Sequence, residues 1–205
     1  EVNKSARQHL CPTAFGVPLI HLDDLGMVIW TFPNDPGLRA LPEVADPDKV
    51  KNYFPYDSLP SGVSAKEIAS VKVEIVNYRP EIRCTTRYRL DCGSRALTLF
   101  GKAFASGGEE IYQRMAHLWQ RSRQRPSEFP MPRPLAYNDE VKTIWQEELP
   151  GKPLAEIINR GNYRELIAQA ARRLVFIHQS DAPTSTRITM KEHLEEIEKK
   201  VAKLN

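Results

Sequence analysis

The sequence predicts an α+β fold, in which an antiparallel sheet precedes a group of helices. Residues 71–78 and 83–90 alternate apolar and polar side chains with a period of two, which is typical of half-buried strands. Residues 95–104 form a third, mostly apolar run, and the short links between the three runs favour an antiparallel meander. Beyond residue 151 the pattern changes to amphipathic helices. This order of strands and helices is typical of the α+β class.

Two further strands and one helix are expected in the sheet region. Residues 107–123 repeat apolar side chains at helical spacing, and the proline-rich stretch at 125–134 ends that helix. Residues 135–137 and 141–149 then favour a fourth and a fifth strand around a hairpin-like turn. The pattern therefore predicts a five-stranded antiparallel sheet with one helix inserted before its last two strands.

The chain divides into three expected parts. Residues 1–62 are rich in proline and short of periodicity, which predicts an N-terminal extension with short strands and a linker. Residues 63–150 hold the sheet and its helix. Residues 151–205 begin a helical part, with longer helices expected at 163–179 and 189–204.

Composition indicates an ordinary soluble domain. The 205 residues are 41% hydrophobic and 27% charged, and a net charge of +3 is too small to indicate nucleic acid as a partner. The three cysteines, Cys11, Cys84 and Cys92, form no Cys-x-x-Cys pair, which favours reduced thiols in a cytoplasmic protein. No apolar run approaches the roughly 20 residues of a membrane span, and the N-terminus lacks a signal-peptide core. We therefore expect no membrane association.

Lys102 is the most informative residue. It lies near the end of the third predicted strand, which is otherwise almost entirely apolar. Burying an unpaired ammonium group is costly, so a lysine in such a strand indicates an anion nearby. A glycine pair and two glutamates follow at 107–110, where the helix begins. The sequence therefore predicts an anion-binding site at Lys102.

Three segments resemble a known family. They run from Phe100 to Phe104, from Gln146 to Leu154 and from Ala170 to His178. In this order and spacing the chain resembles the aminoglycoside phosphotransferase and choline kinase group of the protein-kinase-like fold, particularly its bacterial members. The resemblance covers roughly residues 70–180. It implies that residues 63–150 are the small lobe of that fold and that residues 151–205 begin its helical lobe.

The resemblance implies that Lys102 pairs with the phosphates of ATP. Its helix partner is then Glu109 or Glu110, since no other glutamate occurs before Glu128. In the alternative interpretation, Lys102 ends its strand in solvent and both glutamates are charges favoured by the helix dipole.

The segment from Arg79 to Arg83 takes the place of the phosphate-covering loop of this family. It has no glycine, so its backbone is not suited to fold over phosphates. The guanidinium groups of Arg79 and Arg83 are candidates to bind the phosphates instead. An ordinary surface hairpin rich in arginine is an equally open alternative.

The second segment resembles the hinge between the two lobes. Glu147, Glu148 and Leu149 are the candidates to meet the adenine through backbone N–H and C=O groups. A strand that simply ends before Pro150 would have a similar sequence, so the hinge assignment depends on the neighbouring motifs.

The catalytic motif of the family is not found in this sequence. The family transfers phosphate with an aspartate in a His-x-Asp-x-x-x-x-Asn segment, and a second aspartate binds Mg²⁺. None of the five histidines begins such a segment, and we expect His178 to pack against the core at a helix end. ATP and Mg²⁺ are the expected cofactors, but no catalytic residue or metal ligand is assigned here. In the family this loop lies beyond the helices expected here, so the catalytic half is missing by truncation, by disorder or by genuine loss, and we expect this chain alone to be inactive.

Three functions compete. The first is the nucleotide-binding portion of an ATP-dependent small-molecule phosphotransferase whose phosphate acceptor is unidentified. The second is a non-catalytic kinase-like module that binds a protein partner. The third is an RNA-binding sheet that uses Arg83, Arg87 and Arg89, and the lack of an RNP-like aromatic pattern argues against it. The sequence determines neither the acceptor nor the oligomeric state.

Overall fold

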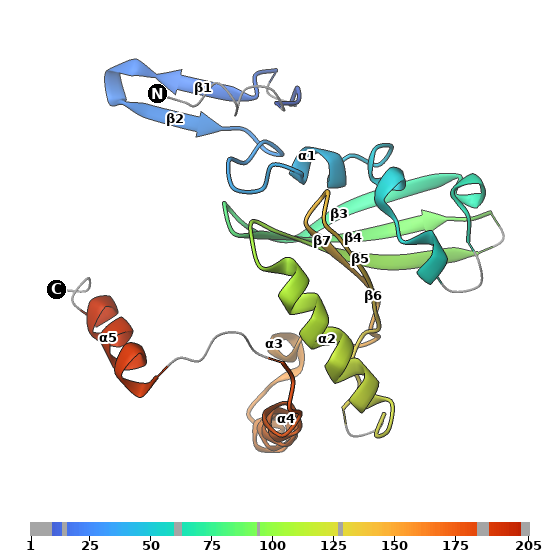
Figure 1. Cartoon of the computed structure of the whole chain (residues 1–205), viewed down its shortest axis with the longest axis vertical. Coiled ribbons are helices and arrows are strands. Elements are labelled where there is room, and N and C mark those ends of the chain that lie inside the picture. Colours follow the sequence, from blue (N-terminus) through green and yellow to red (C-terminus); the bar gives the residue numbers. More distant parts are fainter. Residues whose placement is uncertain are drawn as a thin grey trace.

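The centre of the molecule is a five-stranded antiparallel sheet with the strand order β3-β4-β5-β7-β6. The computed structural model describes residues 10–13, 16–59, 63–93, 95–126, 129–183 and 189–201. Figure 1 shows the sheet with the N-terminal segment on one side and helices α2, α3 and α4 on the other. The predicted α+β class and the five-stranded antiparallel sheet are therefore confirmed.

The sheet strands lie close to their predicted bounds. They are β3 (Ser70–Arg79), β4 (Arg83–Asp91), β5 (Ala96–Phe104), β6 (Pro134–Asn138) and β7 (Thr143–Glu147). Helix α2 (Gly108–Ser122) connects β5 to β6, and α3 (Leu154–Ile157), α4 (Tyr163–His178) and α5 (Met190–Val201) follow the sheet. The end of the last predicted helix, at 202–204, lies outside the described residues.

Short elements precede the sheet. A two-stranded antiparallel hairpin consists of β1 (Leu19–Leu22) and β2 (Met27–Trp30), and α1 (Leu41–Val44) follows it. Short 3-10 helices lie at Asp23–Leu25, Val50–Tyr53, Tyr56–Ser58 and Ala65–Glu67. These single turns have no extended periodicity, which is why the sequence pattern of this region is weak.

The strand register sorts the sheet side chains onto two faces. Residues directly opposite each other on neighbouring antiparallel strands share a face. Tyr88 on β4 lies opposite Leu99 on β5, and both are fully buried. Lys102 lies opposite Thr85 on β4 and Ile144 on β7, on the other side. We call the side of Tyr88 the core face and the side of Lys102 the lysine face.

The core face packs against the segment at 38–68, which mostly belongs to the region expected to be an extension. The Phe54 ring meets the rings of Tyr88 and Trp145 edge to face, at centroid distances of 5.6 and 5.2 Å. The Tyr88 hydroxyl donates to the Val44 carbonyl at 2.8 Å. The same core includes Leu38, Leu41, Val50, Leu59 and Val63. The described part of the expected extension therefore shares its hydrophobic core with the sheet.

Gly101 explains how these rings fit against β5. It lies opposite Thr86 on β4 and Trp145 on β7, so it belongs to the core face. A Cβ atom at this position would lie 2.9 Å from the Tyr88 ring and 3.0 Å from the Trp145 ring. Only glycine lets the rings pack directly on the strand. The glycine beside Lys102 therefore serves the core.

Asp35 ties the N-terminal segment to the turn between β3 and β4. Its Oδ1 accepts hydrogen bonds from the N–H groups of Gly37 and Leu38, at 2.7 and 2.9 Å. Its Oδ2 accepts from the Tyr78 hydroxyl at 2.6 Å and from the Glu81 N–H at 2.9 Å. Burial acts to raise the pKa of Asp35, but these hydrogen bonds outweigh it and lower the pKa. The carboxylate therefore stays charged and holds the turn in place.

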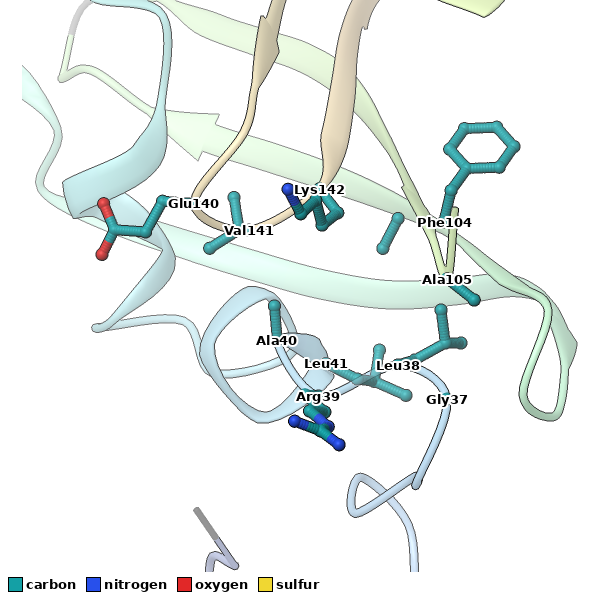
Figure 2. Close-up of a pocket in the computed structure, with 11 residues that line it drawn as sticks. Gly37, Leu38, Arg39, Ala40, Leu41, Phe104, Ala105, Glu140, Val141 and Lys142 are labelled. Carbon is teal, nitrogen blue, oxygen red and sulfur yellow. The ribbon is translucent and has the colours of Figure 1, made fainter. Parts of the chain in front are cut away.

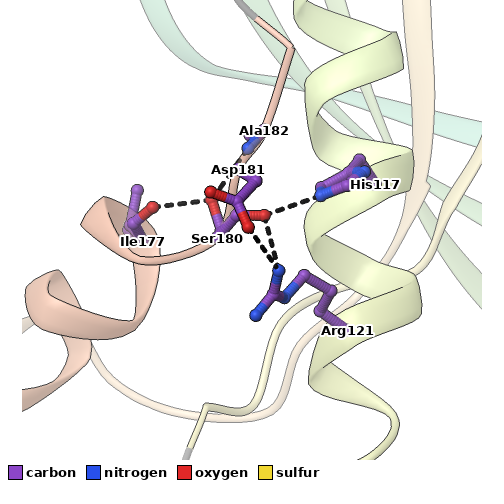
Figure 3. Close-up of polar contacts among 6 residues, drawn as sticks. All are labelled: His117, Arg121, Ile177, Ser180, Asp181 and Ala182. Carbon is purple, nitrogen blue, oxygen red and sulfur yellow. Dashed lines mark hydrogen bonds and ion pairs between the residues drawn. The ribbon is translucent and has the colours of Figure 1, made fainter.

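Helix α2 also holds the start of the helical part. The Ser180 carbonyl accepts hydrogen bonds from His117 Nε2 at 2.8 Å and from Arg121 Nη1 at 2.9 Å (Figure 3). Because a carbonyl only accepts, His117 Nε2 carries the proton. Arg114 Nε donates to the Pro183 carbonyl at 3.0 Å. Three side chains of one helix thus hold the loop that follows α4.

The expectation that His178 packs against the core is wrong. His178 is exposed, and it is Ser180, two residues later, that is buried. Apolar side chains along α4 stay exposed as well, with Ile167 and Leu174 at 52% and 53%. The described residues therefore leave the apolar side of α4 largely uncovered.

The Asp35→Asn substitution tests the tie between the N-terminal segment and the β3–β4 turn. The variant loses the charge and turns one acceptor into a donor, so we expect the free energy of unfolding to fall by about 3 kcal/mol. The lowered pKa means that Asp35 stabilises the fold at neutral pH and that this stabilisation is lost as the pH falls below 3.8. Urea unfolding at pH 7 and at acid pH measures both effects.

The exposed Asp57 is the matched control, because it makes no hydrogen bond with other described residues. Asp57→Asn should change the free energy of unfolding by less than about 0.5 kcal/mol. Equal stability of the two variants would contradict the structural role of Asp35.

Candidate functional site

Lys102 and Arg83 bring two positive charges together on the lysine face. Lys102 lies opposite Thr85, and Arg83 lies two residues before Thr85 on the same strand, opposite Phe104. Diagonal neighbours of this kind are roughly 7–8 Å apart at the backbone, within reach of long side chains. The two cations therefore belong to one site at the end of β5.

Lys102 is a half-buried lysine without a counter-charge. Its ammonium group has no hydrogen bond or ion pair with any other residue that the structure describes. Burial lowers the pKa of Lys102, and the nearby Arg83 guanidinium lowers it further. Because both effects disfavour the charged form, an anion that binds beside Lys102 stabilises its ammonium group.

The other arginines of β4 differ from Arg83 in having a carboxylate partner. Arg87 and Arg89 share the lysine face, as their alternation predicted, and both reach Glu74, at 3.2 and 3.8 Å. The Arg87 guanidinium also lies over the Phe100 ring, 5.2 Å from its centroid. Within the described part of the chain, Arg83 has no such partner. Arg83 and Lys102 are therefore two neighbouring cations of this face without a carboxylate partner among the described residues.

The structure does not pair Lys102 with either candidate glutamate. Glu110 forms an ion pair with Arg114, one turn further along α2. Glu109 is exposed and acts on the pKa values of Tyr137 and Lys142 instead. Both glutamates lie in the first turn of α2, where the helix dipole favours carboxylates. In this conformation the arrangement agrees with the alternative interpretation of the two glutamates.

The turn after β3 is held rigidly, and its arginines extend from it. Besides the bond to Asp35 described above, the Ile82 carbonyl accepts from the Ala105 N–H at 3.1 Å, and the Ile82 N–H donates to the Arg79 carbonyl at 3.1 Å. Arg79 and Arg83 lie opposite each other at the two ends of the turn, and both are exposed. The backbone of this turn is fixed by hydrogen bonds, and only the guanidinium side chains at its ends are free to change conformation.

The hinge candidates lie where β7 ends. The Glu147 N–H donates to the Arg133 carbonyl at 3.0 Å, so this backbone donor is already used. Glu148 and Leu149 follow the strand and are exposed. The Glu147 N–H points to Arg133, so the pairing of Leu99 with Glu147 uses the backbone of the next residue, Glu148, in the ladder to β5. Among the described residues, nothing forms a hydrogen bond with the backbone of Leu149, so its N–H and C=O groups are free for a ligand.

Gln146 is a residue that the sequence reasoning did not select. It lies opposite Phe100, which places it on the lysine face, two residues before Glu148. Its side chain is 8% exposed, and its Oε1 has no hydrogen-bond partner among the described residues. An uncharged side chain in an apolar strand gives no charge signal in the sequence, and only the register places it beside the site.

A cavity of about 310 Å³ lies on the other side of the sheet. It is enclosed by residues 37–41, by the end of β5 and by the turn at 140–142 (Figure 2). Ala103, which lines it, belongs to the core face, opposite Cys84. The ammonium group of Lys142 at its rim pairs with Asp139 at 2.6 Å. None of the predicted site residues lines this cavity.

The described residues contain neither a metal-binding cluster nor a membrane-spanning helix. No group of three or more histidine, cysteine, aspartate or glutamate side chains is placed to hold a metal ion in the described part of the chain. Among the same residues, no helix combines the length and apolar character needed to cross a membrane.

The Lys102→Met substitution tests whether Lys102 is held without a counter-charge. Removing a desolvated ammonium should leave the free energy of unfolding at pH 7 unchanged or raise it by up to about 1 kcal/mol. Because the folded-state pKa is lowered from 10.5, the difference should shrink as the pH rises past 10.5, above which the wild-type lysine is mostly neutral in both states. Urea unfolding from pH 7 to pH 11 measures the effect.

Lys49→Met is the control, because Lys49 has a counter-charge, Glu43, at 3.0 Å. This variant should lose up to about 0.5 kcal/mol. A larger loss for Lys102→Met than for Lys49→Met would show that Lys102 has a stabilising partner.

Comparisons with known proteins assign the chain to no family. A scan against family models, a search of curated proteins and a search of solved structures each found no match. The functional inference therefore depends on the residues and their geometry.

Proposed function

We propose that this chain is the nucleotide-binding portion of an ATP-dependent small-molecule phosphotransferase of the aminoglycoside phosphotransferase and choline kinase type. The observation that carries the proposal is Lys102, a half-buried lysine beside Arg83 with no counter-charge among the described residues. The chain order of three strands, a helix, two strands and further helices supports it, because it is the order that the resemblance implies.

The phosphates bind at Lys102 and Arg83 in this proposal. A lysine acts as a point charge on phosphate, and an arginine adds a planar fork of donors. Arg79, at the other end of the turn, is the next available guanidinium. The rigid turn presents these side chains without a glycine-rich loop.

The base lies towards the end of β7. Glu147 pairs with Leu99, which is three residues from Lys102 along β5, or roughly 10 Å. The free backbone groups of Leu149 follow two residues later, and they are the donor and acceptor for the base. One ligand that is anionic at one end and a hydrogen-bonding ring at the other fits both sets of groups.

Mg²⁺ accompanies ATP in this class of reaction, but the residues around Lys102 do not fit a metal site. They are cationic, whereas Mg²⁺ requires oxygen ligands, chiefly carboxylates and phosphates. We therefore assign the metal no residue of this chain and derive no catalytic step through it. We assign the chain nucleotide binding, and no catalytic residue.

A second candidate function is a non-catalytic module that binds a protein partner. The exposed apolar side chains of α4, such as Ile167 and Leu174, favour it. The absence of an ion pair between Lys102 and Glu109 or Glu110 also fits a lobe that does not bind nucleotide.

Nucleotide binding distinguishes the two functions. We expect ATP with Mg²⁺ to raise the melting temperature of the wild-type chain, since a ligand at 100 times its Kd stabilises a protein by roughly 2.7 kcal/mol. Lys102→Met should weaken ATP binding at least tenfold, and Arg83→Gln should weaken it less, because the phosphates lose one of two cations. Thermal shift and equilibrium titration with a fluorescent ATP analogue measure both.

Lys49→Met is again the control, because it removes a lysine far from the lysine face and should leave ATP affinity unchanged. A wild-type chain that shows no shift with ATP at millimolar concentration would exclude the nucleotide site and favour the protein-binding module.

A further inference from the structure

Gln146 occupies a distinct position on the lysine face. It lies directly opposite Phe100 on β5, and Phe100 is two residues from Lys102 on the same face, or roughly 7 Å along the strand. The displacement is towards Glu148, away from the end of β5 where Lys102 and Arg83 lie. In the proposed binding mode this is the base end of the nucleotide.

The side chain of Gln146 is unusual because it is buried and incompletely paired. Only 8% of its surface is exposed, and no donor among the described residues reaches its Oε1. A buried amide carbonyl that accepts no hydrogen bond is destabilising, and such groups are rare in folded proteins. A ligand that supplies an N–H group at this point removes the penalty.

Purine bases differ in what they present at their 6-position. Adenine carries an amino group there, which donates, whereas guanine carries a carbonyl oxygen, which accepts. A donor on the base satisfies the Gln146 Oε1 as it lies, while a carbonyl on the base can be met only if the buried amide turns over to present its Nε2. The chemistry of the unpaired atom therefore favours an adenine nucleotide.

We propose that Gln146 determines the base specificity of this site by accepting a hydrogen bond from the 6-amino group of adenine. The inference rests on the proposed nucleotide site and adds to it a side chain that selects the base. Gln146 thus acts on the base, while Lys102 and Arg83 act on the phosphates whichever base is present.

A double-mutant cycle between the protein and the ligand tests this role. The ligands are ATP and purine riboside triphosphate, which lacks only the 6-amino group. The wild-type chain should bind ATP about tenfold more tightly than the analogue, the effect expected of one hydrogen bond to a buried acceptor. In Gln146→Leu the two affinities should agree within about threefold, through weaker ATP binding. GTP should bind the wild-type chain more weakly than ATP.

Gln120→Leu is the matched control, because Gln120 is exposed on α2 and should leave the tenfold ratio unchanged. Gln146→Met is a second variant, so the cycle can still be measured if the leucine variant unfolds. Far-ultraviolet circular dichroism and the melting temperature of the free proteins establish that each variant is folded.

The outcomes separate the two proposals. A ratio that stays tenfold in both Gln146 variants overturns the role of Gln146 and leaves the nucleotide site intact. A wild-type chain that binds both nucleotides equally also overturns it. A wild-type chain that binds neither overturns the nucleotide site itself, and the role of Gln146 with it.

Discussion

The close packing of Gly101 against the rings of Tyr88 and Trp145 is the constraint on which the rest of the structure depends. The two rings pack on the backbone of β5, because a Cβ atom at Gly101 would lie 2.9–3.0 Å from them. Successive residues of a strand point to opposite faces, so the residue after Gly101 must lie on the side away from the core. That residue is Lys102. The same packing that buries the aromatic cluster therefore presents the lysine on the opposite face of the sheet, away from the N-terminal segment.

The N-terminal segment stabilises this arrangement at two points. Phe54 packs edge to face against the aromatic cluster and closes the core face. Asp35 accepts hydrogen bonds from Gly37 in its own loop and from Glu81 in the β3–β4 turn, so it joins the two segments. The backbone of that turn is thereby fixed, and in the proposed site only the side chains of the turn are left to meet a ligand. The N-terminal segment thus packs on the core face and stabilises the strands and the turn that carry the residues of the lysine face.

The lysine face combines satisfied and unsatisfied groups in a regular way. Arg87 and Arg89 share Glu74 as a carboxylate partner, and Arg87 is hydrogen-bonded to it, although the buried Arg87 Nε has no partner among the described residues. Lys102 on β5 lacks a counter-charge, and Gln146 on the neighbouring strand β7 lacks a donor among the described residues. One group requires an anion and the other requires an N–H group. The two groups lie about one strand repeat apart, and in the proposed site a bound nucleotide would pair with both, through its phosphates and its base.

The sequence by itself determined the strands, the inserted helix and the place of Lys102 in an apolar strand. These features depend on local periodicity and on one charge in an apolar strand, and both are visible without knowledge of distant contacts. It also placed Arg83, Arg87 and Arg89 on one face by alternation. It did not determine which of these cations has a carboxylate partner, because Glu74 lies on a different strand and the pairing depends on the β3–β4 register.

Only the tertiary structure decided the role of the N-terminal segment, the surroundings of His178 and the position of Gln146. The first depends on single helical turns that leave no periodic pattern, although they bury Leu41 and Val50 completely. His178 was expected to be buried from its place in an amphipathic helix, but the described residues do not cover that helix. Gln146 gained its significance from strand register alone. Burial and pairing across strands arise from contacts between residues far apart in the chain, and a local pattern does not contain them.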